Sequence, residues 1–300
     1  MSNLIITILR QRIIVLALIS VVTIGGAVDR KLSRIKSASS AGSPRILSDE
    51  LTHDHEVAPL TSHMKRGFRI NVHPSKRAPV TRLSPRLESE RLVATMASEL
   101  TEAISLPEEI QFSFEDCSFP DMYYDDESHS VIMCYQWIDD MQLILAHQLR
   151  GRGDVREMVQ NLVLAVLLHE TAHALIHMLK IPVTGREEDD ADQFSTLVLL
   201  HQKDGARKAL QVAQQFKIMS RFSGGELSDY SDEHSPDGQR YYDTLCMIYG
   251  RDPEANAKLV SKKWLPDVRA DLCEDDYRRI ESSWKLLLKP YAKDSLWAAQ

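Results

Sequence analysis

The sequence has no excess of positive charge. It carries 36 Lys and Arg residues against 43 Asp and Glu residues, and its formal net charge at pH 7 is -7. A protein that binds nucleic acid needs a basic surface that neutralises phosphates. Since neither the overall balance nor any cluster of Lys and Arg supplies one, we do not expect nucleic acid to be a partner.

Cysteine is scarce, with 4 residues in 300, and no spacing forms the Cys-x-x-Cys pair of a zinc knuckle or a redox motif. An even number of cysteines favours disulfides if the chain reaches an oxidising compartment. Four cysteines allow three pairings, and we prefer the sequence-local one, which joins Cys117 to Cys134 and Cys246 to Cys273. In the cytosol they would instead be four free, buried thiols.

The hydrophobic run at the N-terminus is short for a membrane span. Residues 13–28 fall below the roughly 20 apolar residues that a spanning helix needs, and a longer span would bury Arg10 and Arg12. Two arginines, an apolar run and closing small residues are the three parts of an export signal. We expect a cleaved signal peptide over residues 1–27, with a retained membrane anchor through residues 4–28 as the alternative. The protein is then periplasmic or secreted.

Composition also divides the rest of the chain. Residues 28–65 are rich in Ser, Ala, Lys, Arg, Pro and His without a sustained period, which predicts a flexible linker. Residues 66–292 are expected to form one domain, and residues 293–300 a tail. With 43% hydrophobic residues, the chain can bury a substantial core.

Hydrophobic periodicity predicts a few strands followed by many helices. Alternating patterns indicate strands at 68–72, 109–114 and 130–135. Three- and four-residue steps indicate helices at 87–104, 155–180, 186–200, 206–222, 239–249 and 275–288. The expected class is α+β, mostly α, with a small sheet in the N-terminal half. We expect the strand at 130–135 to form a sheet edge that pairs with an extended substrate.

The helix predicted at 155–180 carries the residues of a zinc-protease motif, His-Glu-Thr-Ala-His at 169–173. Residues four apart lie on one helix face roughly 6 Å apart, so His169 and His173 can bind one Zn²⁺ ion with Glu170 beside it. Such a match arises by chance in roughly one chain of this length in a hundred. The surrounding sequence therefore has to support the motif.

An acid-rich helix supplies the supporting residues. Acids collect at helix N-termini because the helix dipole favours negative charge there, but five acids at positions 187–192 exceed that need. A tetrahedral zinc site needs a third protein ligand. Glu188 stands 15 residues after His173 across a short turn, and we assign it that role. Glu187 and Asp189 are the alternatives.

Asp192 lies four residues after Glu188 and shares its helix face. It is predicted to accept the ring N–H of His169 or His173 and so to fix the tautomer of that ring. Zinc would hold a water in the fourth position, and Glu170 would take its proton as general base and pass it to the leaving amine. This arrangement predicts hydrolysis of peptide bonds in a peptide or protein substrate.

These residues resemble a known family. The motif at 169–173 with Glu188 and Asp192 is similar to bacterial metallopeptidases long classed as a domain of unknown function, within the gluzincin pattern of H-E-x-x-H plus E-x-x-A-D. The resemblance runs from about Phe68 to Tyr291 and departs from the family pattern at Gln136, where that pattern has Glu. It implies an exported, zinc-dependent peptidase with a zincin-like fold and an undefined substrate.

His234 is a further candidate catalytic residue. It lies in a predicted loop beside Asp232 and Glu233, where a histidine could donate to the oxyanion that forms when water attacks a carbonyl, as in thermolysin-like enzymes. A surface histidine paired with its acidic neighbours is the alternative. Weaker candidates for the same task are Arg240, Tyr241 and Tyr242. His177 lies about 12 Å along the helix from His169, too far for the same ion, and is expected beside the site.

Two rival functions remain at this level. One is a catalytically idle zinc-binding scaffold in the cell envelope, although a scaffold does not need the base Glu170. The other is a structural helical protein in which H-E-x-x-H arose by chance. Only the second rival predicts that the protein holds no stoichiometric metal.

Overall fold

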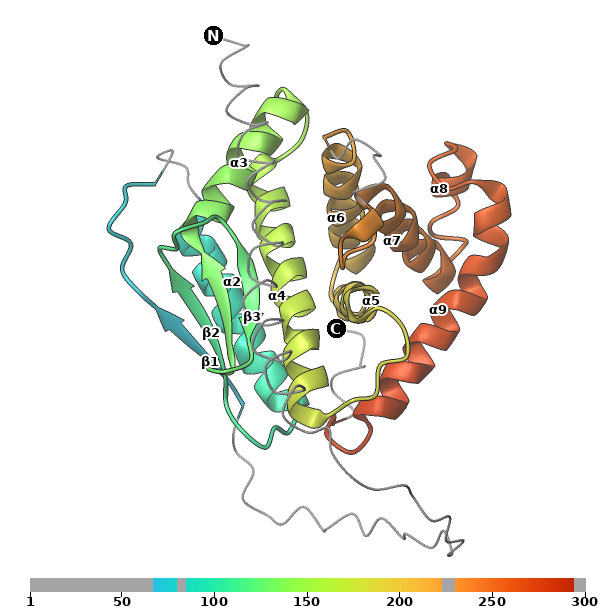
Figure 1. Ribbon diagram of the computed structural model, residues 1–300. Coiled ribbons are helices and arrows are strands. Elements are labelled where there is room, and N and C mark those ends of the chain that lie inside the picture. The colour runs from blue at the N-terminus through green and yellow to red at the C-terminus, as the bar shows by residue number, and fades with distance from the viewer. Residues whose placement is uncertain (1–66, 80–84, 223–229, 294–300) are drawn as a thin grey trace, which may run out of the picture. The chain divides into compact units, whose positions relative to one another are not determined.

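A computed structural model describes residues 67–79, 85–222 and 230–293 of the chain (Figure 1). The signal peptide predicted at 1–27, the linker at 28–65 and all of the tail but Lys293 lie outside these residues. Those domain boundaries therefore stay predictions.

A small mixed sheet occupies the N-terminal half, with strand order β1-β2-β4-β3. The strands are β1 (Phe68–Val72), β2 (Ile110–Glu115), β3 (Met122–Asp125) and β4 (Ser130–Cys134). β1, β2 and β4 run parallel, while β3 is antiparallel to β4. Ile110, Phe112 and Phe114 alternate along β2 and are completely buried, so one face of the sheet belongs to the core.

The prediction that residues 130–135 form a sheet edge is wrong. β4 lies between β2 and β3, and the edge of the sheet that packs against α4 (Val155–Leu179) is β3. A turn at 126–129 joins β3 to β4 as a hairpin. β3 therefore pairs with the side of β4 that we expected to be open to a substrate. The sequence pattern did not identify β3 because four residues are too few to show a period.

Helices make up most of the remaining fold, which confirms the α+β class with a small sheet in the N-terminal half. They are α2 (Arg86–Ala103), α3 (Tyr135–Leu149), α4, α5 (Glu187–His201), α6 (Gly205–Met219), α7 (Asp237–Arg251), α8 (Lys258–Ser261) and α9 (Asp267–Leu288). α9 begins earlier than the predicted residue 275. Its first turns expose Val268 and Leu272 (79% and 57%), so they lack the apolar stripe that marks a packed helix.

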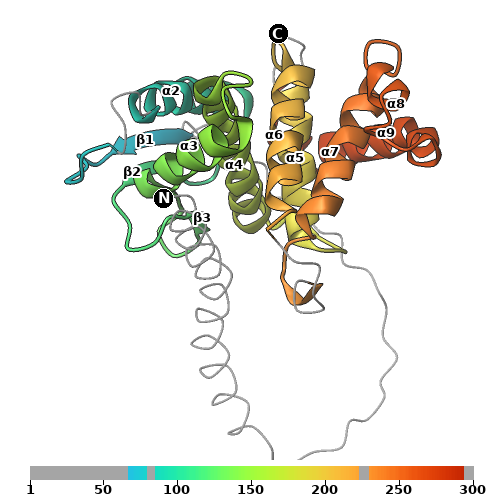
Figure 2. The same ribbon diagram turned by 90° about the horizontal axis from the view of Figure 1, so that it is seen from above.

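α4 is the central helix of the fold. Figure 2 shows it between the sheet with α2 and α3 on one side and the helices from α5 onward on the other. Its N-cap is Asp154, whose carboxylate accepts the backbone N–H of Glu157 at 3.1 Å. Among the described residues it alone is long and apolar enough to cross a membrane. However, 72% of its most apolar window is buried inside the protein, as expected of a core helix.

Both sequence-local disulfides are formed, which confirms the preferred pairing. Cys117–Cys134 joins the loop before β3 to the end of β4, and Cys246–Cys273 joins α7 to α9. Two disulfides suggest an oxidising, extracytoplasmic environment.

Candidate metal centre

The side-by-side packing of α4 and α5 brings together His169, His173 and Glu188, which we call the metal centre. Glu188 Oε2 lies 3.0 Å from His169 Nε2, and Glu188 Oε1 lies 3.4 Å from His173 Nε2. The two Nε2 atoms are 3.2 Å apart. Ligand atoms at about 2.1 Å from one tetrahedral zinc ion would be about 3.4 Å apart. The three side chains therefore fit a single ion.

The outer nitrogen of each histidine is held by its own carboxylate. His169 Nδ1 lies 2.9 Å from Asp192 Oδ1, and His173 Nδ1 lies 2.7 Å from Glu187 Oε1. An ionised carboxylate can only accept a hydrogen bond, so both Nδ1 atoms carry the hydrogen. In a neutral ring with the hydrogen on Nδ1, the Nε2 lone pair would face the other ring and the carboxylate of Glu188. Such a set of donors is stabilised by a shared cation.

The electrostatics of the metal centre favour positive charge. Burial alone would lower the pKa of His169, but hydrogen bonds with Asp192 and Glu188 outweigh it and raise that pKa to about 10. Burial alone would raise the pKa of Glu188, but its contacts with three histidines hold it far below the ordinary range. Both pKa shifts arise because negatively charged groups and histidines lie close together. Protons or a divalent cation can neutralise this negative charge.

Glu170 lies beside the metal centre and faces the edge strand. It is only 8% exposed, and burial raises the pKa of its carboxyl group. Its Oε2 accepts the backbone N–H of Tyr124 on β3 at 2.9 Å. A carboxylate with a raised pKa next to a metal site has the properties of a general base.

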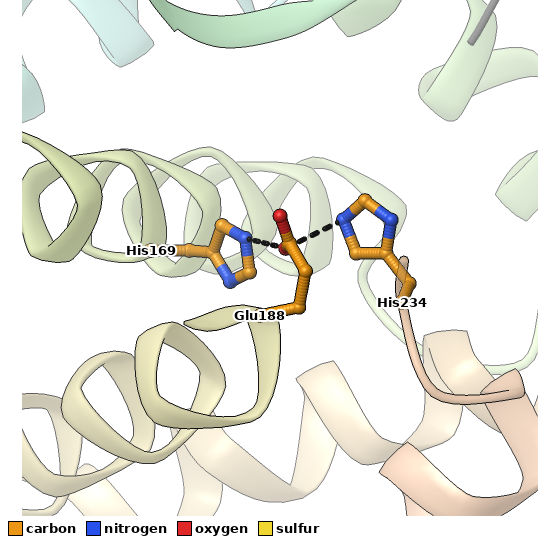
Figure 3. Close-up of side chains that lie close together, drawn as sticks. All are labelled: His169, Glu188 and His234. Carbon is orange, nitrogen blue, oxygen red and sulfur yellow. Dashed lines mark hydrogen bonds and ion pairs between the residues drawn. The ribbon is translucent and has the colours of Figure 1, made fainter. Parts of the chain in front are cut away.

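The loop before α7 brings His234 to the same place. His234 Nε2 lies 2.9 Å from Glu188 Oε2, and Figure 3 shows this carboxylate between His234 and His169. One ligand atom from each of these three residues lies within 4.8 Å of the others. His234 Nδ1 also lies 3.2 Å from Asp232 Oδ1, and the side chain is 40% exposed. His234 therefore lies beside the metal centre and also contacts its acidic neighbour Asp232, so the structure is compatible with both hypotheses for this residue.

The alternative third ligands point elsewhere. Glu187 contacts the outer nitrogen of His173 and lies 3.3 Å from His177 Nε2, while Asp189 accepts the hydroxyl of Ser235 at 2.7 Å. His177 is 45% exposed at the side of the metal centre, where its ring meets that of Tyr124. Of the three acids considered, Glu188 is the one placed at both Nε2 atoms.

Arg240, a weaker candidate for the oxyanion role, binds Asp192. Its guanidinium donates to both carboxylate oxygens of Asp192, at 2.6 and 2.7 Å. Of the other two weak candidates, Tyr241 is buried and Tyr242 is 42% exposed. No sequence signal pairs Arg240 with Asp192, because they are 48 positions apart on different helices.

Comparison with known proteins identifies a family for this chain. The chain matches the family DUF4344, described as "Putative metallopeptidase", over residues 73–288. This range is more than two thirds of the chain and includes every residue of the metal centre. No curated protein and no solved structure matches the chain.

Proposed function

We propose, from the premise that this chain belongs to the DUF4344 family, that it is an exported zinc-dependent peptidase with a zincin-like active site. In this proposal His169, His173 and Glu188 hold the zinc ion. The observation that carries it is the convergence of two Nε2 atoms on one carboxylate, while both Nδ1 atoms are tied to other acids.

The donor set supports zinc as the metal. Two imidazoles and one carboxylate are typical of catalytic zinc sites, which keep the fourth position open. A bound zinc ion would supply a water of lowered pKa and a Lewis acid for the scissile carbonyl. Asp192 and Glu187 would keep the two rings in the tautomer whose Nε2 binds the ion.

Glu170 would act as the general base. Its carboxylate would take a proton from the attacking water and pass that proton to the leaving amine. The peptide N–H of Tyr124 holds one of its oxygens, which orients the carboxylate without neutralising it.

The substrate would lie along β3. In an antiparallel pair, the N–H and C=O of one residue point to the same side of the strand. The N–H of Tyr124 points to Glu170 and away from β4, so its C=O also faces the free edge. An extended peptide that paired with this edge would place a backbone carbonyl next to Glu170.

The Nε2 atom of His234 could have one of two roles, as a donor to the oxyanion or as a fourth zinc ligand. Burial alone would lower the pKa of His234, but the contact with Glu188 outweighs burial and raises that pKa. The protonated ring could then donate a hydrogen bond to the oxyanion. If Nε2 instead completed the coordination as a fourth protein ligand, the site would be closed, as structural zinc sites are. His234 Nε2 lies 2.9 Å from Glu188 Oε2, which is close enough for both to bind one ion. The catalytically idle zinc scaffold is therefore the second candidate function.

Metal analysis and one variant test the proposal. Purified wild-type protein and Glu170→Gln are analysed for zinc by mass spectrometry and incubated with a broad peptide library. The peptidase predicts one zinc per chain in both proteins and cleavage by the wild type only. Zinc without cleavage would support the scaffold, and the absence of stoichiometric metal would support a chance motif.

A further inference from the structure

We infer that Arg240 is a positioning residue of the metal centre, acting through Asp192 on His169 and through the start of α7 on His234. This inference rests on the proposed metal centre. Within the described part of the chain, the guanidinium of Arg240 hydrogen-bonds to Asp192 and to neither the proposed ligands nor the proposed base.

Arg240 and Asp192 form a two-point ion pair. Arg240 Nε donates to Asp192 Oδ2 at 2.6 Å, and a second guanidinium nitrogen donates to Oδ1 at 2.7 Å. The same Oδ1 accepts the Nδ1 hydrogen of His169 at 2.9 Å. Two parallel hydrogen bonds fix the plane of a carboxylate, which a single contact does not. Arg240 thereby sets the direction from which Asp192 holds the ring of His169.

The Arg240–Asp192 pair is largely enclosed by the protein. The side chains of Arg240 and Asp192 are 17% and 25% exposed, and the guanidinium lies 4.3 Å from the ring centroid of Phe216 on α6. A largely buried guanidinium needs an anionic partner, and a largely buried carboxylate needs a cationic one. Each residue therefore keeps the other ionised and in place. Lysine could supply the charge but not the planar fork or the stacking on Phe216.

The Arg240–Asp192 pair also lies next to the segment that carries His234. Arg240 lies in the first turns of α7, directly after the loop that carries His234. In the same segment, the hydroxyl of Ser235 donates to Asp189 at 2.7 Å. Asp189 and Asp192 are three residues apart and so lie on one face of α5. These two contacts attach the segment with His234 to the helix that carries Glu188.

The chain offers a matched control for Arg240. A cavity of about 310 Å³ borders the pair, and Arg269 of α9 also lines it. Arg269 binds Asp276 at 2.6 Å and Asp243 at 3.3 Å, and among the described residues it forms no ion pair with Asp192. Replacing Arg269 removes the same charge from the same cavity without disturbing the carboxylate that holds His169.

The experiment measures metal binding rather than catalysis. Full-length wild type, Arg240→Gln, Arg240→Lys and Arg269→Gln are freed of metal, checked for helical content by circular dichroism, and titrated with Zn²⁺ against a chromogenic chelator. Arg240→Gln should weaken zinc binding roughly 10- to 100-fold, as loss of a group that orients a ligand does. Arg240→Lys should recover part of that loss, and Arg269→Gln should bind zinc as the wild type does. The visible spectrum of the Co²⁺-loaded protein should change in Arg240→Gln and stay as in the wild type in Arg269→Gln.

A double variant distinguishes a specific effect of Arg240 on zinc binding from general misfolding. Arg240→Gln leaves Asp192 buried without its cation, whereas Arg240→Gln with Asp192→Asn removes both charges. If Arg240 acts through Asp192, this double variant should bind zinc as weakly as Asp192→Asn alone, because the two effects are coupled. Additive losses would overturn the inference, as would an unchanged affinity and Co²⁺ spectrum in Arg240→Gln, or an equal loss in Arg269→Gln. A wild type that binds neither Zn²⁺ nor Co²⁺ would overturn the proposed function itself.

Discussion

The backbone N–H of Tyr124 donates to Oε2 of Glu170 at 2.9 Å, across 46 positions of the chain. This hydrogen bond joins the edge strand of the sheet to the acid next to the first histidine of the motif. Because the donor is a peptide group, the contact does not depend on the tyrosine side chain. The sheet and the central helix therefore meet where substrate and base would have to meet.

The first prediction concerns Glu170. A glutamine at this position can still accept the N–H of Tyr124 but cannot take a proton from water. Glu170→Gln should keep its zinc and lose about 10²- to 10⁴-fold in kcat/KM, the usual contribution of a general base. Peptide cleavage and zinc content are measured on the same preparation, and full activity in the zinc-loaded variant would rule out Glu170 as the base.

The second prediction separates the two roles of His234. If it stabilises the oxyanion, His234→Ala should bind zinc nearly as the wild type does and lose about 10²- to 10³-fold in kcat, as other enzymes lose on removal of one such donor. If it is a fourth ligand, the same variant should lose metal affinity. Zinc titration of His234→Ala, with Tyr242→Ala as an exposed control on the following helix, distinguishes the two.

The third prediction compares the disulfides. Cys117–Cys134 closes a segment that contains all of β3, while Cys246–Cys273 joins two helices away from that strand. Replacing either pair with serine should cost about 2–4 kcal/mol of stability, since each closes a loop in the unfolded chain. Only Cys117→Ser with Cys134→Ser should also reduce peptide cleavage at temperatures where both variants are folded. Equal activity in the two folded variants would contradict the role given to β3.

The fourth prediction concerns pH. In the metal-free protein the pKa of His169 is raised to about 10, above its ordinary value of 6.5. A raised pKa stabilises the fold fully below the unfolded value, and this contribution is lost as pH rises from about 6.5 to about 10. The lowered pKa of Glu188 adds no slope in this window, because that group is ionised in both states. The chelator-treated protein should therefore lose stability between pH 7 and 9, on the order of 1 kcal/mol per pH unit.

Thermal unfolding at several pH values checks this slope. The zinc-loaded protein is the control, because zinc occupies Nε2 of His169 in place of the proton and should flatten the curve. His169→Ala, chelator-treated, should also show a flatter curve. A metal-free wild type whose stability rises from pH 7 to 9 would contradict the prediction.

Much of the fold could be predicted because the helices carry their own pattern. The apolar period indicated α4 directly, and the confinement of the strands to the N-terminal half indicated the class. β3 could not be found in this way, since it is short and owes its place to the hairpin with β4. The first turns of α9 could not be predicted either, because Val268 and Leu272 are exposed there and form no apolar stripe with helical spacing.

Within the site, spacing along one helix was informative and contacts between helices were not. His169 and His173 share a face by helical geometry alone. Which acid meets which ring depends on how α5 lies against α4. The two helices run antiparallel, so the earlier acid, Glu187, meets the later histidine, and Asp192 meets the earlier one. The sequence left open which ring Asp192 meets, and gave no sign that Glu187 contacts His173 or that Arg240 binds Asp192.

The most direct test of the account is the zinc content of purified protein in three matched variants. Glu188→Gln removes the carboxylate that both Nε2 atoms face, whereas Glu187→Gln and Asp189→Asn remove neighbouring acids from the same helix turn. We predict one zinc per chain in the wild type and in Asp189→Asn, weaker but measurable binding in Glu187→Gln, and none retained by Glu188→Gln. A wild type without stoichiometric metal, or a Glu188→Gln variant that keeps its zinc, would contradict the central claim.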